Sequence, residues 1–165
     1  GTVSAPCAQA CPRSCTGPAS PRLSSRRSPR DFTSAQVILV TRTDAEGYAA
    51  VKSTVPDAQF NKLAGIVWAD RRPVETPIQG VAVVTAGTSD LPVAEEASGT
   101  ARLMGCEVVR IVDVGVAGLH RTLGSLPEWR EAKDLVVVAG MEGALPSVIG
   151  GLVSSPVNAV PTSTE

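Results

Sequence analysis

The stretch with the clearest chemical potential is TAGTSD, residues 85–90, which directly follows the apolar run 81–84. Its glycine allows a tight backbone path. Ser89 or Asp90 can cap a following helix, and Pro92 suits the first turn of that helix. Free N–H groups at the helix start, together with two hydroxyls, could bind a phosphate-like anion. Plain helix capping is the alternative, since the stretch is neither a P-loop nor a GxGxxG fingerprint.

Two further loops carry ionisable groups after apolar runs. The first, DVGVAGLHR at residues 113–121, holds the only histidine of the chain, His120. Its imidazole could shuttle a proton or donate a hydrogen bond to a phosphate, and a structural role is the alternative. The second, AGMEGALP at residues 139–146, places Glu142 between two glycines. A carboxylate at a strand end suits acid–base chemistry, and the alternative is an exposed loop side chain.

Short apolar runs alternate with helix-like stretches along the part of the chain that carries these loops. We predict strands at 37–41, 65–69, 81–85, 108–112, 135–139 and 157–160, and helices at 44–55, 91–104, 117–123, 127–133 and 145–153. The alternation predicts parallel strands joined by crossover helices on both faces. We therefore expect a doubly wound α/β sheet over 78–165, preceded by a smaller α/β unit and linker at 37–77. In such sheets ligands bind beyond the carboxyl ends of the strands, where the three loops would lie.

Composition narrows the classes of function. The formal net charge is −1 and aromatic residues make up 3% of the chain, which argues against a nucleic-acid partner. The apolar runs are far shorter than the ~20 residues that cross a bilayer, so we expect no membrane span. Apolar residues make up 43% of the chain, enough for the core of one ordinary domain.

The first part of the chain, 1–36, has a different composition: it is rich in Pro, Ser, Ala and Arg and poor in acidic residues. Such a segment buries too little apolar surface to fold, so we expect a disordered leader or an organelle transit-like tail. The expected location is the cytoplasm, or an organelle if the leader is a transit peptide. Cys7, Cys11 and Cys15 lie there without a fourth ligand at zinc-like spacing, so we expect no metal site. Cys106 stands alone, which favours a reducing compartment.

Four motifs in order carry a resemblance to a known family: TAGTSDLPVAEEA, DVGVAGLHR, VVVAGMEGALPSVIGGLV and PVNAVPTS. Together they resemble the pyridinium-biscarboxylic acid mononucleotide synthases, which make the pyridinium precursor of the nickel-pincer cofactor of lactate racemase. The resemblance covers about 79–163 and, more weakly, VTRTDAEGYAAVKSTVPDA upstream. This family is related to the aminoimidazole ribonucleotide carboxylases and mutases of purine synthesis. The implied fold is a flavodoxin-like, three-layer αβα domain with a parallel sheet.

The resemblance implies a reaction on a small nucleotide. Carbon dioxide or bicarbonate would carboxylate the pyridinium ring of nicotinic acid adenine dinucleotide, and hydrolysis of the phosphoanhydride would release AMP. Catalysis would fall to Glu142, near the ring or as the base, and to His120. The remaining binding residues would be Thr88, Ser89, Asp90, Asp113, Gly115, Arg121, Gly140 and Gly143. No cofactor would be bound covalently, Mg²⁺ is a candidate accompanying ion, and the full-length protein would be a homo-oligomer.

Two departures from the family patterns leave alternatives open. The purine enzymes carry a histidine before the Leu-Pro pair of the third loop, whereas this chain has Ala144. The purine reaction is therefore the weaker interpretation. The family's nucleophilic cysteine lies beyond the Pro-Thr-Ser turn, and this chain has no cysteine after Cys106. We therefore expect a domain that is incomplete at its C-terminus. An inactive nucleotide-binding remnant is a third interpretation.

Overall fold

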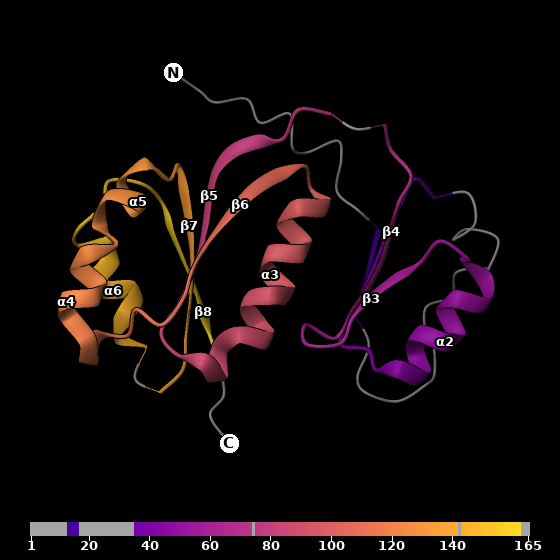
Figure 1. Ribbon diagram of the computed structural model, residues 1–165, viewed down its shortest axis with the longest axis horizontal. Helices are drawn as coiled ribbons and strands as arrows, with labels where there is room; N and C mark the ends of the chain where they lie inside the picture. Colours follow the sequence, from indigo (N-terminus) through magenta and orange to yellow (C-terminus); the bar gives the residue numbers. More distant parts are fainter. Residues whose placement is uncertain (1–12, 17–34, 74, 142, 163–165) are drawn as a thin grey trace. The chain divides into compact units, whose positions relative to one another are not determined.

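The computed structural model describes residues 13–16, 35–73, 75–141 and 143–162, and for 13–16, 119, 121 and 122 it describes the backbone only. The chain divides into two compact units, Gly1–Glu75 and Thr76–Glu165 (Figure 1). The expected leader falls almost entirely outside the described residues. Within it, strand β1 (Arg13–Thr16) pairs in parallel with β2 (Val37–Thr41). Strand β1 was not predicted, because that segment lacks apolar periodicity.

The first unit contains a mixed sheet with the strand order β1-β2-β4-β3. Strand β4 (Ile66–Asp70) pairs antiparallel with both β2 and β3 (Gln59–Asn61). Helix α2 (Ala45–Thr54) begins after Asp44, whose carboxylate accepts a hydrogen bond from the Gly47 N–H at 2.9 Å. This is the N-cap arrangement that satisfies a free N–H at a helix start. In the core of the unit, α2 and the loop after it pack against the sheet, and the buried residues are Ile38, Val55, Ala58, Val67 and Ala69.

An exposed ion pair joins the loop after α2 to the end of β4. Arg71 donates two hydrogen bonds to Asp57, each 2.6 Å long. This charged hydrogen bonding lowers the pKa of the Asp57 carboxyl from 3.8 to about 2 and raises the pKa of Arg71. The neighbouring pair is similar, because hydrogen bonding from Arg72 lowers the pKa of Asp70.

The second unit contains the predicted parallel sheet. Its strand order is β6-β5-β7-β8, and all three neighbouring pairs are parallel. The strands are β5 (Ile78–Thr85), β6 (Cys106–Ile111), β7 (Asp134–Ala139) and β8 (Val157–Pro161). The helices are α3 (Leu91–Leu103), α4 (Leu119–Gly124), α5 (Leu126–Glu131) and α6 (Ala144–Gly150). The expected flavodoxin-like α/β fold is therefore confirmed.

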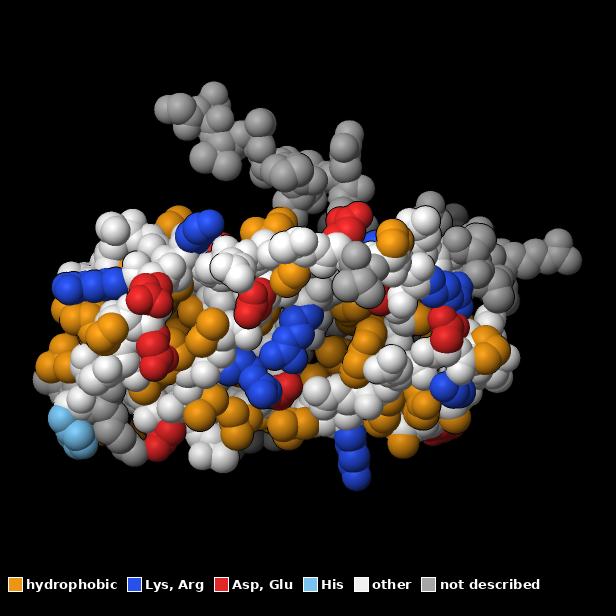
Figure 2. Space-filling model, turned by 45° about the horizontal axis from the view of Figure 1, so that its top comes forward, with side chains coloured by type: hydrophobic (Ala, Val, Ile, Leu, Met, Phe, Trp, Pro, Cys, Tyr) orange, Lys and Arg blue, Asp and Glu red, His pale blue; other side chains and the backbone are white. Residues whose placement is uncertain are grey.

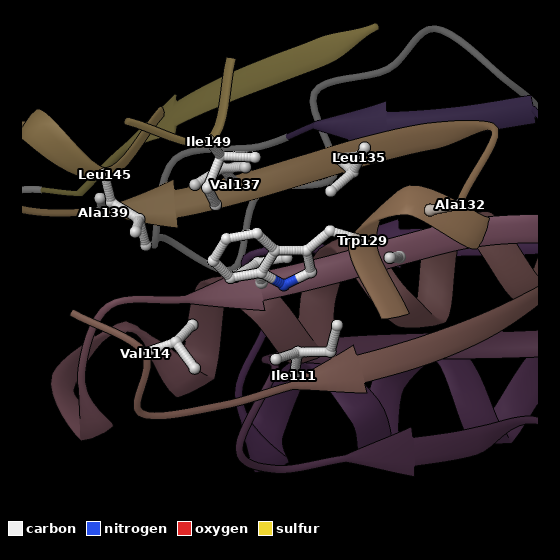
Figure 3. Packing of buried hydrophobic residues seen from close by; sticks show 11 residues of the cluster. Ile111, Val114, Trp129, Ala132, Leu135, Val137, Ala139, Leu145 and Ile149 are labelled. Carbon is white, nitrogen blue, oxygen red and sulfur yellow. The ribbon is translucent and has the colours of Figure 1, made fainter. Parts of the chain in front are cut away.

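Helices cover both faces of this sheet, with α3 on one side and α4 to α6 on the other (Figure 1). Side chains alternate between the faces along a strand. Val83 accordingly packs with Ala94 of α3, whereas its neighbours Ala82 and Val84 belong to the opposite cluster. That opposite cluster is the larger core. Trp129 of α5 lies at its centre, fully buried against β7 and α6 (Figure 3).

The surface carries charges of both signs. On the face shown in Figure 2, Lys and Arg side chains alternate with Asp and Glu, and apolar side chains lie between them. An even mixture agrees with the net charge of −1 and provides no continuous basic surface on this face. Among the described residues, none of the helices has the length and apolar character that a membrane crossing requires.

Candidate functional site

A cleft of about 230 Å³ lies at the carboxyl ends of β5, β6 and β7. This is the edge of a parallel α/β sheet at which ligands bind. The loops after these three strands and the start of α6 form its walls. The lining residues are Ala86, Gly87, Ser89, Asp90, Gly115, Val116, Ala117, Ala139, Gly140, Met141, Ala144 and Leu145.

The turn after β5 is held in shape by a buried carboxylate. Asp90 is only 3% exposed, and it ends the short 3₁₀ turn Thr88–Asp90 that leads into α3. One of its oxygens accepts a hydrogen bond from the Gly87 N–H at 3.0 Å, and the other accepts one from the Thr162 hydroxyl at 2.6 Å. Both oxygens therefore have partners within the protein. In this structure Asp90 fixes the turn and ties it to the segment after β8.

The two hydroxyls of this turn differ in position. Both Thr88 and Ser89 are exposed, but Ser89 lines the cleft and Thr88 does not. Ser89 can therefore reach a ligand in the cleft directly. Backbone bonds anchor the turn on two sides, because Ala86 N–H donates to the Val138 carbonyl at 3.2 Å and Val114 N–H donates to the Thr85 carbonyl at 3.1 Å.

The loop after β6 approaches the β5 turn so closely that one position requires glycine. A Cβ atom on Gly115 would lie 2.9 Å from the carbonyl oxygen of Ala86, closer than real Cβ contacts allow. Gly115 therefore lets the two loops form adjacent walls of the cleft. Asp113 precedes it with a φ of 60°, is exposed, and is not among the lining residues.

The histidine of this loop is not brought to the cleft. His120 is exposed on α4 and is absent from the lining residues. The side chain of Arg121, the next residue, lies outside the described part of the chain. The stretch DVGVAGLHR was expected to bring both His120 and Gly115 to the ligand, but only Gly115 lines the cleft, and His120 lies on α4.

The loop after β7 supplies the remaining wall. Gly140 and Met141 line the cleft, whereas Gly143 is not among the lining residues and joins the loop to α6. Gly143 N–H donates to the Gly140 carbonyl at 3.1 Å, which closes a tight turn. Glu142, the proposed base, lies between them but outside the described residues. Sequence reasoning overlooked Met141, which carries no ionisable group, and the bond from Thr162 to Asp90, which joins segments far apart in the sequence.

The described lining is mostly small and apolar. Its only ionisable side chain is Asp90, and among the described residues no lysine or arginine lines the cleft. The described residues also contain no group of three or more His, Cys, Asp or Glu side chains that could hold a metal ion. Asp90, with both oxygens engaged, and Ser89 do not form a donor set for Mg²⁺, which prefers octahedral oxygen coordination.

Comparison with known proteins identifies the family. Residues 80–165 match the family model of AIR carboxylase. The chain belongs to the AIR carboxylase family. Over 112 residues it is 48% identical to the uncharacterized protein MJ0165 of Methanocaldococcus jannaschii, an alignment that covers 66% of this chain and 44% of that relative. The chain thus spans less than half the length of the curated relative that it matches. The matched segment of the AIR carboxylase family begins in β5 and includes every lining residue of the cleft.

Proposed function

We propose that this chain provides the nucleotide-binding core of an enzyme that carboxylates the pyridinium ring of nicotinic acid adenine dinucleotide and releases AMP. Membership of the AIR carboxylase family supports carboxylase or mutase chemistry. The observation that favours a pyridinium substrate is Ala144. It lines the cleft immediately before Leu145 and Pro146, where the related purine enzymes carry a histidine.

The electronic character of the pyridinium ring determines which catalytic groups such an enzyme needs. A pyridinium ring is electron-poor, so its carbons do not attack carbon dioxide. A thiolate that adds to a ring carbon converts the ring to an enamine, whose nucleophilic carbon then forms the bond to carbon dioxide. A base removes the proton from the newly carboxylated carbon, and departure of the thiolate restores the aromatic ring. Water separately cleaves the phosphoanhydride and releases AMP.

Among the described side chains, the one thiol is too far from the cleft for this step. Cys106 is the first residue of β6, next to Ile78 at the amino end of β5. The cleft lies at the carboxyl end, and a six-residue strand with a rise of about 3.3 Å per residue separates the two ends by about 17 Å. Cys7 and Cys11 lie outside the described residues, and Cys15 is described by its backbone alone. We therefore expect this chain to bind the dinucleotide without carboxylating it.

The second candidate substrate is aminoimidazole ribonucleotide, the substrate after which the matched AIR carboxylase family is described. Its ring is already an electron-rich enamine-like system, so the addition of a thiolate is not required. The lining of small side chains and the Ser89 hydroxyl suit either ribonucleotide. A third candidate is a catalytically inactive nucleotide-binding domain, and the position of Cys106 supports that candidate.

Calorimetric titration with the two ribonucleotides separates these functions. We expect nicotinic acid adenine dinucleotide to bind more tightly than aminoimidazole ribonucleotide, and Ala144→His to reduce or reverse the preference. Ala49→His, at an exposed alanine of α2 in the other unit, is the matched control and should change neither affinity. Tighter binding of aminoimidazole ribonucleotide by the unaltered chain would contradict the pyridinium proposal.

A turnover assay tests the role of the thiol. The purified chain is incubated with dinucleotide and bicarbonate, and both products are followed by mass spectrometry. We expect no carboxylated mononucleotide, with AMP release slow at most, since anhydride hydrolysis needs positioning and charge stabilisation rather than a thiol. Carboxylated product at turnover levels that persists in Cys106→Ala would show that another group of this chain is the nucleophile.

A further inference from the structure

Met141 is unusually exposed for an apolar residue that lines the cleft. It lines the wall formed by the loop after β7, yet 85% of its surface is exposed, the largest value among the exposed large apolar side chains of the described residues. The cleft therefore has a flexible apolar side chain at its rim that is largely uncovered.

The backbone conformation at Met141 is energetically unfavourable for a residue with a side chain. Its φ of 55° lies in the left-handed region, which side chains with a Cβ seldom adopt. Gly143, two residues later, adopts the same region with a φ of 61°, as a glycine does without strain. Methionine at position 141 thus has neither a conformational advantage nor a buried contact that would offset its exposure.

The rest of the described lining suits a flat, weakly polar group. Ala86, Ala117, Ala139 and Ala144 line the cleft with single methyl groups, and no lysine or arginine joins them in the described lining. Methyl-lined walls leave room for a planar ring and supply no charge to bind a phosphate directly. A methionine side chain is unbranched and polarisable, and its sulfur makes favourable contacts with aromatic rings.

We propose that Met141 closes over the heteroaromatic ring of the bound nucleotide and selects for ligands that carry such a ring. The inference rests on the proposed function, since it names the part of the nucleotide that this wall recognises. Binding covers the thioether, and the apolar contact offsets the exposure seen in the free chain. Sulfur–aromatic contact strengthens binding by about two- to tenfold.

Two ligands that differ only by the ring test the proposal. Nicotinic acid mononucleotide and ribose 5-phosphate share the sugar and the phosphate. We expect Met141→Ala to weaken binding of the mononucleotide about two- to tenfold and to leave ribose 5-phosphate unchanged. Met141→Leu keeps the apolar volume without the sulfur and should lie between. Leu63→Ala, at an exposed leucine of the other unit, is the control and should change neither affinity.

The chain carries an internal control for a second measurement, because its only other methionine is Met104, the C-cap residue that follows α3. The cleft lies at the start of that helix, whose 13 residues span about 20 Å. Under mild peroxide we expect the mononucleotide to slow oxidation of Met141 several-fold, as followed by peptide mass spectrometry. Oxidation of Met104 should be unchanged, and ribose 5-phosphate should protect neither methionine.

The outcomes separate the two proposals. If the mononucleotide binds but Met141→Ala binds it equally well, or if Met141 oxidises at the same rate with and without it, the role of Met141 is overturned and nucleotide binding stands. If neither nicotinic acid adenine dinucleotide nor the mononucleotide binds, the proposed pyridinium function is overturned. If aminoimidazole ribonucleotide alone binds, weaker binding by Met141→Ala supports the role of Met141, and equal binding overturns it. If no ribonucleotide binds, both proposals fail.

Discussion

Replacing Asp90 by alanine removes two hydrogen bonds at once from the turn after β5. The carboxylate is 3% exposed and accepts from the Gly87 N–H at 3.0 Å and the Thr162 hydroxyl at 2.6 Å. Hydrogen bonds to a charged group are worth about 1.5–3 kcal/mol each. Release of a buried carboxylate from desolvation offsets part of that loss. We therefore expect Asp90→Ala to lower the free energy of unfolding of the second unit by about 2–4 kcal/mol.

Asparagine at the same position provides a matched comparison. Its carbonyl oxygen can accept from Gly87 N–H, and its NH₂ group can donate to the Thr162 hydroxyl oxygen, because a hydroxyl both donates and accepts. Both contacts then persist without the charge. Asp90→Asn should cost no more than about 1.5 kcal/mol, clearly less than alanine.

Intrinsic fluorescence provides the assay, because the two tryptophans lie in different units, Trp68 in β4 and Trp129 in α5. In a Trp68→Phe background, Trp129 reports urea unfolding of the second unit alone. A cycle of Asp90→Ala, Thr162→Val and both together should give a coupling energy of about 1–2 kcal/mol. Additive effects, or a loss below about 0.5 kcal/mol for Asp90→Ala, would refute the role assigned to this carboxylate.

Three other predictions follow from contacts elsewhere. Gly115→Ala places a Cβ atom within 2.9 Å of a backbone carbonyl oxygen. This substitution should lower the free energy of unfolding of the second unit by about 1–3 kcal/mol and weaken nucleotide binding. Gly124→Ala, which meets nothing within 4 Å, should do neither in the same assays. Ser98 is 1% exposed and its hydroxyl has no hydrogen-bond partner among the described residues, so Ser98→Ala should raise the free energy of unfolding by up to about 1 kcal/mol; a lower free energy of unfolding in urea melts would contradict this. Hydrogen bonding from Arg71 lowers the pKa of Asp57 from 3.8 to about 2. The contribution of this ion pair to the free energy of unfolding should therefore be complete above pH 4 and lost as the pH falls toward 2. Carbon-detected NMR titration should place the Asp57 midpoint near 2, and Arg71→Gln should return it toward 3.8.

The fold of the second unit was predictable because its two central strands are largely buried. The segments VAVV and LVVVA have no polar residue to mark an exposed face, and both form central strands, β5 and β7. Helix α3 began at the predicted Leu91, where Pro92 suits the first turn. Predictions were less accurate where elements are short. The expected helix 117–123 is a 3₁₀ turn at Val116–Gly118 followed by α4, and such boundaries depend on tertiary contacts that periodicity does not show.

The candidate site was predictable as a meeting of loops, but not as a set of side chains. Parallel topology brings Ser89, Gly115 and Gly140 to one cleft, as the positions of their loops implied. The partner of Asp90 is 72 residues away in sequence, so no local pattern indicates that its oxygens are occupied. His120 fell within the predicted helix 117–123, but which side of that helix faces the cleft depends on tertiary contacts that the sequence does not show.

Hydrogen bonds hold the loops of the cleft in place, but the described lining supplies few reactive groups. Backbone bonds from Ala86 and Val114, together with the Asp90–Thr162 bond, lock the loops after β5 and β6 to each other and to the end of the sheet. A cleft held this way is pre-organised to position a ligand. Yet the described lining offers only the Ser89 hydroxyl and an engaged carboxylate, and a hydroxyl without an adjacent base is a weak nucleophile. Covalent chemistry on a pyridinium ring here therefore requires a thiol from outside the described lining, whereas binding of the nucleotide does not.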